Sequence, residues 1–193
     1  MDPLSILDIV NIAEYEIERP SYRDQIIKFK KTRRIQIGEL VTLVFENRET
    51  IRFQIQEMMR AERIVLEDRI QEEIDTYNQL LPKLNSFSAT LLIEVTDQTR
   101  MREILDSFIG IDHGNTTSLK IGGSVVYGEY EGGRSKEDRV SAIHYVTFSL
   151  SDQQVSQFIS GEEPISFEID HFKYNAETVI NETVRESLSQ DLL

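Results

Sequence analysis

Three histidines, His113, His144 and His171, are the only imidazole side chains in a chain of 193 residues that contains no cysteine. Imidazole nitrogens and carboxylate oxygens bind transition metals, and a histidine beside a carboxylate can also transfer protons. His144 and His171 share the alternation of the apolar residues in two predicted strands, 140–150 and 165–169. Both side chains are therefore expected to point into the core.

The pairing of these two strands decides whether the histidines meet. In an antiparallel pair His171 lies opposite Ile143 and close to His144, so that His144, Asp170 and His171 form a candidate metal or acid–base site. A parallel pair separates the two imidazoles by roughly 10 Å. The alternative is that each histidine is a core residue hydrogen-bonded to the backbone or to a carboxylate. A transition metal is the one possible cofactor, and His113 is expected on the surface.

A second candidate site lies in the polar stretch 54–63. Arg60 and Arg63 are three residues apart on a predicted helix and share one face, where two guanidinium groups could hold a carboxylate or a phosphate. With Glu57 they are the ligand-binding candidates. Alternatively, Glu57 and Glu62 neutralise the two arginines within the helix.

A third cluster is basic and consists of Lys28, Lys30, Lys31, Arg33 and Arg34. An anion or an acidic partner could dock there. The alternative is that these cations complement the carboxyl end of a helix and pair with nearby acids.

Composition excludes several functions. Without cysteine the chain has no disulfide, thiolate metal site or cysteine nucleophile. A net charge of −13 argues against nucleic acid and anionic membranes as partners. The sequence has no catalytic motif and no secretory signal, and its apolar runs are too short to span a membrane. These observations indicate a bacterial cytoplasmic protein and favour a role without catalysis, with an enzyme as the alternative.

Periodicity predicts a single α+β domain over 1–193, with a mostly antiparallel sheet, flanking helices and an N-terminal helical segment, 5–32, packed on it. Arg19-Pro20 is expected to end the first helix, and 131–138 is predicted to be a polar, Gly-rich loop. The predicted helices are 5–17, 21–32, 56–64, 70–81, 97–110, 151–161 and a last one from Asn181, and the predicted strands are 34–37, 40–45, 51–56, 89–95, 119–121, 125–130, 140–150 and 165–169.

Several sequence blocks together resemble one bacterial family. They are Tyr15 with Arg19-Pro20, residues 41–48 and 54–64, Tyr77-Asn78, Leu81-Pro82, 89–91, Gly110-Ile111, 142–145, Asp170-His171 and Val184-Arg185 with Leu188. This pattern is similar to family 3501 of the domains of unknown function over almost the whole chain. The chain departs from the family at Phe172, where a proline is expected.

The resemblance implies no activity, but it does imply partners. Members are often encoded near rubrerythrin and near an iron–sulfur oxidoreductase of the glycerol-3-phosphate dehydrogenase type. One hypothesis is thus a non-enzymatic accessory protein of an oxidative-stress system, with a homodimer as the default assembly. The other is a metal- or anion-binding protein, or an enzyme, in which Arg60 and Arg63 hold an anionic substrate beside His144, Asp170 and His171.

Overall fold

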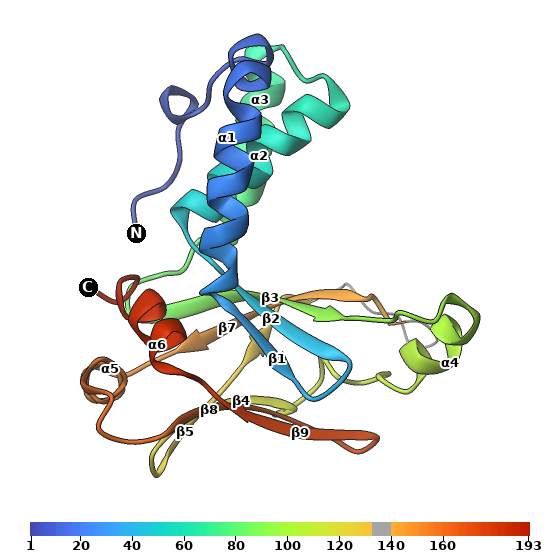
Figure 1. The fold of residues 1–193 in the computed structure, drawn as a ribbon, viewed down its shortest axis with the longest axis vertical. Coiled ribbons are helices and arrows are strands. Elements are labelled where there is room, and N and C mark those ends of the chain that lie inside the picture. The colour runs from blue at the N-terminus through green and yellow to red at the C-terminus, as the bar shows by residue number, and fades with distance from the viewer. Residues whose placement is uncertain (133–139) are drawn as a thin grey trace.

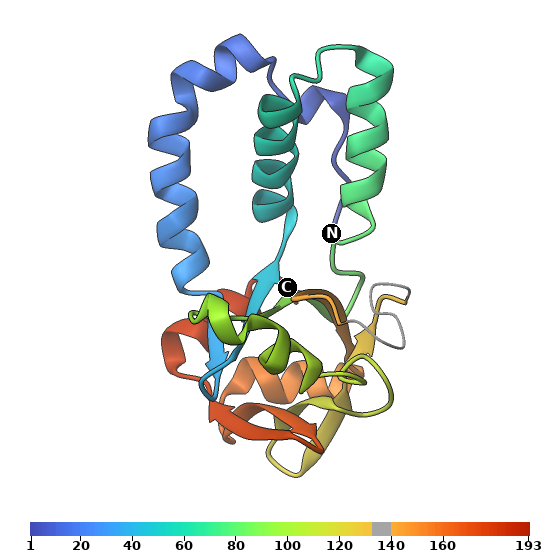
Figure 2. The same cartoon turned by 90° about the vertical axis from the view of Figure 1, so that its right-hand side faces the viewer.

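The computed structural model describes residues 1–132 and 140–193 and has two parts, which we call the arm and the body (Figure 1). The arm consists of the N-terminal segment 1–11, α1 (Ile12–Lys31), α2 (Arg48–Glu62) and α3 (Glu67–Asn78). These three helices lie side by side and project from the body (Figure 2). The body holds all the described strands and the remaining helices.

The body is built from two antiparallel sheets, so the predicted α+β class is confirmed, although the strands form two sheets and not one. The five-stranded sheet has the order β1 (Arg34–Ile37), β2 (Val41–Glu46), β3 (Ser86–Ile93), β7 (Ile143–Ser149), β6 (Glu129–Tyr130). The four-stranded sheet has the order β5 (Ser124–Tyr127), β4 (Thr117–Ile121), β8 (Ile165–His171), β9 (Tyr174–Val179). Of these, β9 was not predicted from the sequence.

The two sheets enclose the main hydrophobic core. Phenylalanine rings from both sheets meet there, with centroids 5.1 Å apart for Phe45 and Phe167 and 5.4 Å apart for Phe148 and Phe167. Helices α5 (Asp152–Ser160) and α6 (Glu182–Ser189) lie at one end of this core (Figure 1). The short helices η2 (Gln98–Arg100) and α4 (Met101–Asp106) lie at the other end.

The arm has a hydrophobic core of its own, built by α2, α3 and the N-terminal segment. Its buried residues are Leu4, Ile51, Ile55, Met59, Ile74 and Leu80. The N-terminal segment, which includes η1 (Ile6–Asp8), is tied to this core where Asn78 accepts a hydrogen bond from the Leu4 amide at 2.9 Å. The N-terminal segment is thus an integral layer of the arm.

The predicted break at Arg19-Pro20 is wrong, because α1 runs unbroken from Ile12 to Lys31 with Pro20 inside it. A proline in a helix removes one N–H donor and crowds the preceding turn, which bends the helix. Figure 2 shows such a bend in the N-terminal half of α1. The helix continues through it because side chains on both sides of Pro20, including Tyr15 and Ile26, are buried.

The predicted strand 51–56 is also wrong, since these residues belong to α2. Asn47 caps this helix by accepting hydrogen bonds from the amides of the second and third helical residues at 3.1 Å. Ile51 and Ile55 lie four residues apart and face the arm core, whereas Phe53 contacts Tyr22 of α1 at 5.7 Å. Because α2 packs on two sides, apolar residues at 51, 53 and 55 alternate with polar ones, which is the pattern expected of a strand.

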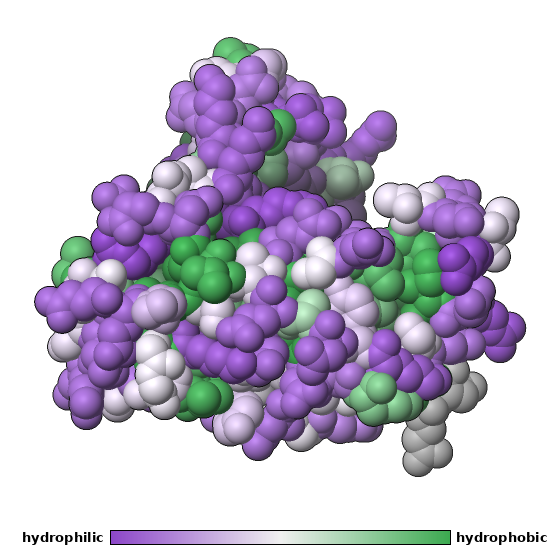
Figure 3. Space-filling model, turned by 60° about the horizontal axis from the view of Figure 1, so that its bottom comes forward, coloured by the Kyte–Doolittle hydropathy of each residue, from purple (hydrophilic) through white to green (hydrophobic). Residues whose placement is uncertain are grey.

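The outer face of the four-stranded sheet is mostly hydrophilic, with separate apolar spots (Figure 3). Lys120 on β4 pairs with Glu168 on β8 at 3.0 Å and with Glu177 on β9 at 3.3 Å. Of the predicted loop 131–138, residues 133–138 lie outside the described residues. None of the described helices combines the length and the apolar character needed to cross a bilayer.

Candidate functional site

The two strands that carry His144 and His171 lie in different sheets, so both pairings considered for them are wrong. β7 pairs with β3 and β6, and β8 pairs with β4 and β9. His144 therefore lies opposite Leu91, and His171 lies opposite Tyr174. The connection through α5 crosses from one sheet to the other and does not return beside β7.

His144 is buried, as its alternation predicts, with 1% of its surface exposed. Its Nε2 lies 2.8 Å from the backbone oxygen of Ser141, and its Nδ1 lies 3.9 Å from Oδ2 of Asp112. The Asp112 side chain is 7% exposed, and its Oδ1 has no hydrogen-bond partner among the described residues. At 3.9 Å the imidazole and the carboxylate are within ion-pair distance but too far apart for a hydrogen bond. Sequence reasoning missed Asp112, which lies between helix and strand where no periodicity marks its burial.

His171 is also buried, and both of its ring nitrogens are occupied. Nε2 donates to the backbone oxygen of Ile109 at 3.0 Å, and Nδ1 accepts from the backbone amide of Lys173 at 3.4 Å. Asp170, one residue earlier on β8, is exposed and accepts from Asn175 at 2.9 Å. No group of three or more histidine, aspartate and glutamate side chains in the described ranges could hold a metal ion. The three predicted metal ligands are thus not brought together.

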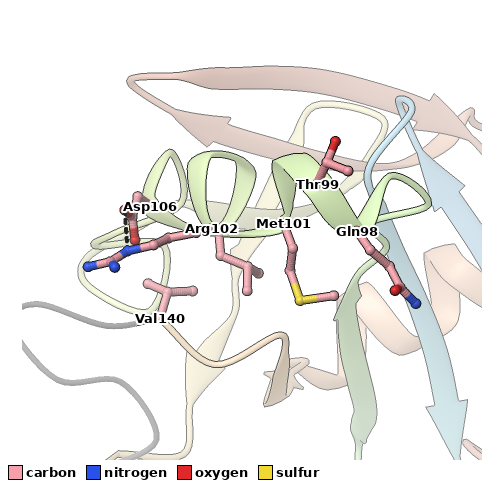
Figure 4. Close-up of a pocket in the computed structure, with 7 residues that line it drawn as sticks. Gln98, Thr99, Met101, Arg102, Asp106 and Val140 are labelled. Carbon is pink, nitrogen blue, oxygen red and sulfur yellow. Dashed lines mark ion pairs between the residues drawn. The ribbon is translucent and has the colours of Figure 1, made fainter.

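The two histidines instead contact the same connection, which joins α4 to β4. His171 binds this connection at Ile109, and His144 faces it at Asp112. A hollow of about 470 Å³ lies beside α4 and is lined by Met101, Arg102 and Val140 among others (Figure 4). In this view Arg102 points along the helix toward its C-terminal end, where its Nε lies 3.8 Å from Oδ2 of Asp106. Both histidines thus contact the connection between α4 and β4 and hold it in place at this end of the body.

Glu57 lies in the seam between α1 and α2, where three hydrogen bonds occupy its carboxylate. Arg19 donates from Nε at 2.7 Å and from Nη2 at 2.8 Å, and the Tyr15 hydroxyl donates at 2.7 Å. The hydrogen bond from Arg19 lowers the pKa of Glu57 below its ordinary value. Burial raises the pKa of the Tyr15 phenol. The seam thus holds Glu57 ionised and Tyr15 protonated at neutral pH.

The two arginines of the predicted anion site differ in their contacts. Nε of Arg60 lies 2.7 Å from a carboxylate oxygen of Glu16, so the acid that neutralises Arg60 comes from α1 and not from α2 itself. Arg63 ends α2 in the left-handed conformation, with φ 55°, and is exposed. Within the described ranges Arg63 has no ion pair. The structure therefore leaves one of the two guanidinium groups available to a ligand or partner.

The basic cluster at the end of α1 is used within the fold. Lys30 lies 3.8 Å from the buried carboxylate of Glu46. The fully buried Arg33 donates to the backbone oxygen of Phe45 at 3.1 Å and pairs with Asp191 near the C-terminus. These contacts favour the structural interpretation of the cluster over anion binding.

The connection between α2 and α3 lies at the far end of the arm (Figures 1 and 2). Arg63 borders a hollow there, and we call the residues that line this hollow, 62–66 and Arg69, the tip. The hollow has a volume of about 290 Å³. Val65 and Leu66 line it and are 70% and 63% exposed. Apolar side chains exposed together beside a cation are typical of a surface that binds another protein.

Comparisons with known proteins show a family but no activity. No curated protein matches the chain. A crystal structure of a novel protein of unknown function from Burkholderia pseudomallei K96243 is similar, with a TM-score of 0.91 and 32% sequence identity over 99% of this chain and 100% of that one. The family model described as protein of unknown function (DUF3501) matches residues 3–192. The chain therefore belongs to this family of proteins of unknown function.

Proposed function

We propose that the protein is a non-enzymatic accessory protein that binds another protein through the tip of its arm. The observation that carries this proposal is the exposure of Val65 and Leu66 beside Arg63, at the end of a helical projection. Burying two such side chains at an interface removes apolar surface from water and favours binding. A partner that fits presents an apolar side chain next to a carboxylate.

The arm is built to hold the tip in a fixed position. The hydrogen bonds of Glu57 with Arg19 and Tyr15 join α1 to α2, and the arm core joins α2 to α3. A preorganised surface loses less conformational entropy on binding than a flexible one. This rigidity supports docking by the tip as a unit.

The family resemblance supplies the candidate partners, which are rubrerythrin and the associated iron–sulfur oxidoreductase. An oxidative-stress role in a bacterial cytoplasm follows from them as part of the proposal. The net charge of −13 favours association with a partner that carries a basic region around the acceptor site for the tip.

The test is a binding assay between the purified full-length protein and each purified candidate partner. The double substitution Val65→Asp with Leu66→Asp places charge in the hollow, and we expect it to weaken binding at least about tenfold. The matched control is Leu84→Asp, because Leu84 is 87% exposed but lies outside the tip. Equal weakening by both variants, or no binding of either partner to the wild type, would contradict the proposal.

A second candidate function is binding of a metal ion near His144. The observation that favours it is the buried Oδ1 of Asp112, which lacks a hydrogen-bond partner among the described residues. The test is elemental analysis of protein purified without chelators, in the wild type and in His144→Ala. A stoichiometric transition metal that the variant loses supports this function, and a metal-free, folded wild type contradicts it.

A further inference from the structure

A separate pocket lies where the arm joins the body, and we call it the junction pocket. It has a volume of about 310 Å³ and lies between the chain that follows α3 and the face of the five-stranded sheet opposite the main core. Leu81 and Lys83 line it from the arm side, and Ser88, Thr147 and Glu129 line it from the sheet. A volume at the lower end of the range for ligand sites suits a molecule of few atoms.

The sheet side of the pocket belongs to one polar row that crosses four strands. Glu46 on β2 pairs with Ser88 on β3, Ser88 pairs with Thr147 on β7, and Thr147 pairs with Glu129 on β6. Residues opposite each other in neighbouring strands point to the same side of a sheet. The row therefore places two hydroxyl groups between two carboxylates on a single face.

Ser88 is the most informative member of this row. The residue is 5% exposed, lines the pocket, and makes no side-chain hydrogen bond within the described part of the chain. The neighbouring hydroxyl on the same strand behaves differently, since Thr90 donates to Glu46 at 2.7 Å. The Ser88 hydroxyl is not sealed off from the pocket, so a molecule that enters the pocket can form a hydrogen bond with it.

The charged residues around the pocket indicate whether that ligand is positively or negatively charged. The exposed Glu129 lines it with a carboxylate that has no ion pair within the described ranges, and Lys83 is the one cation among its described lining residues. The hydroxyls of Ser88 and Thr147 can accept hydrogen bonds from a donor group beside this carboxylate. Leu81 adds an apolar wall on the arm side, against which a hydrocarbon chain can lie.

We propose that the junction pocket binds a small aliphatic amine, with an ammonium group held by Glu129 and the Ser88 and Thr147 hydroxyls and its methylene groups against Leu81. An ammonium group is a donor without acceptors, which matches a wall formed by a carboxylate and hydroxyls. This site is independent of docking at the tip. Because the ligand touches both parts of the molecule, its binding joins the arm to the body.

The experiment is a titration of the full-length protein with the four-carbon diamine putrescine, followed by calorimetry and by amide chemical shifts in NMR at constant ionic strength. We expect saturable binding, with shifts centred on Ser88 and Thr147. Glu129→Gln keeps the size of an exposed side chain while removing its charge, and we expect it to weaken binding about tenfold or more. Ser88→Ala is expected to weaken binding as well, because it removes a hydroxyl that lines the pocket.

Two controls separate a built site from general attraction to an acidic protein. Glu177→Gln removes a carboxylate from the outer face of the other sheet and is expected to leave putrescine binding unchanged. The diol of the same chain length replaces the ammonium groups with hydroxyls and is expected not to bind. Absence of saturable putrescine binding, equal weakening by Glu177→Gln, or equally tight binding of the diol would each overturn the proposal.

Discussion

The guanidinium group of Arg19 holds the carboxylate of Glu57 with two hydrogen bonds, of 2.7 and 2.8 Å, across the seam between α1 and α2. The two side chains are 26% and 29% exposed, so water screens part of their attraction. The paired geometry still fixes how α1 lies on α2, because a planar guanidinium and a carboxylate match in only a few orientations. The seam is therefore a positional constraint on the arm.

Glu57→Gln is expected to destabilise the protein near neutral pH, because glutamine keeps the size of the side chain but loses the charge that Arg19 and Tyr15 bind. We expect Tm to fall by roughly 2–4 °C. The Arg19 hydrogen bond lowers the Glu57 pKa, so this stabilisation is present above the ordinary pKa of 4.5 and is lost as pH falls through the folded-state value. Calorimetry from pH 7 to pH 3 measures both effects.

The control for this variant is Glu72→Gln on α3. Glu72 pairs with Arg69 at 2.8 Å, but the two side chains are 63% and 61% exposed. Such a pair contributes little to stability. A fall in Tm from Glu72→Gln that equals the one from Glu57→Gln would show that the Arg19–Glu57 pair stabilises the protein no more than an exposed ion pair does.

The pKa of the Asp8 carboxyl group provides a numerical prediction. Its carboxylate accepts a hydrogen bond from Nη2 of Arg48 at 2.6 Å, and this bond with others lowers its pKa from 3.8 to about 2. An NMR titration of the Asp8 carboxyl group is expected to show a midpoint near that value. In Arg48→Met the midpoint is expected to rise toward 3.8, and an unchanged midpoint would exclude Arg48 as the cause.

The sequence predicted the burial of single residues better than it predicted their neighbours. Alternation along a strand depends only on local geometry, and it correctly placed His144 and His171 inside. Which strands pair is decided by the packing of the whole chain, and here it separated the two histidines into different sheets. Asp112 became the buried neighbour of His144 through a connection that carries no periodic signal.

The same distinction explains the predicted ligand-binding residues. The spacing of Arg60 and Arg63 correctly indicated a helix, but it could not show that Glu16 of α1 lies beside Arg60. A local pattern identifies the face of a helix, and only the tertiary fold decides what covers that face. Arg63 remained available because it lies beyond the last turn of α2.

Pro20→Ala tests why α1 remains one helix. Alanine restores an N–H donor in the middle of α1 and removes the ring that crowds the preceding turn, which together favour the helix. The gain is reduced because alanine also widens the conformational freedom of the unfolded chain. We expect Tm to rise by roughly 2–4 °C in scanning calorimetry. A fall in Tm would show that the bend itself is required for packing on α2.

His171 is expected to matter as a hydrogen-bond donor to the connection between α4 and β4. His171→Leu leaves the backbone oxygen of Ile109 buried without its donor, and we expect the free energy of unfolding to fall by about 1–3 kcal/mol beyond the change caused by shape. His171→Gln keeps a donor at a similar distance from the backbone and is expected to lose less. Urea denaturation of the three proteins measures the difference.

The same pair of variants separates this structural role from metal binding. Nε2 of His171 is held by Ile109, so a glutamine that replaces this bond is expected to preserve stability whether or not metal is present. If His171 served instead as a metal ligand, glutamine would bind the ion poorly, and both variants would lose stability equally. Equal losses that disappear when the wild type is treated with a chelator would therefore assign His171 to a metal site.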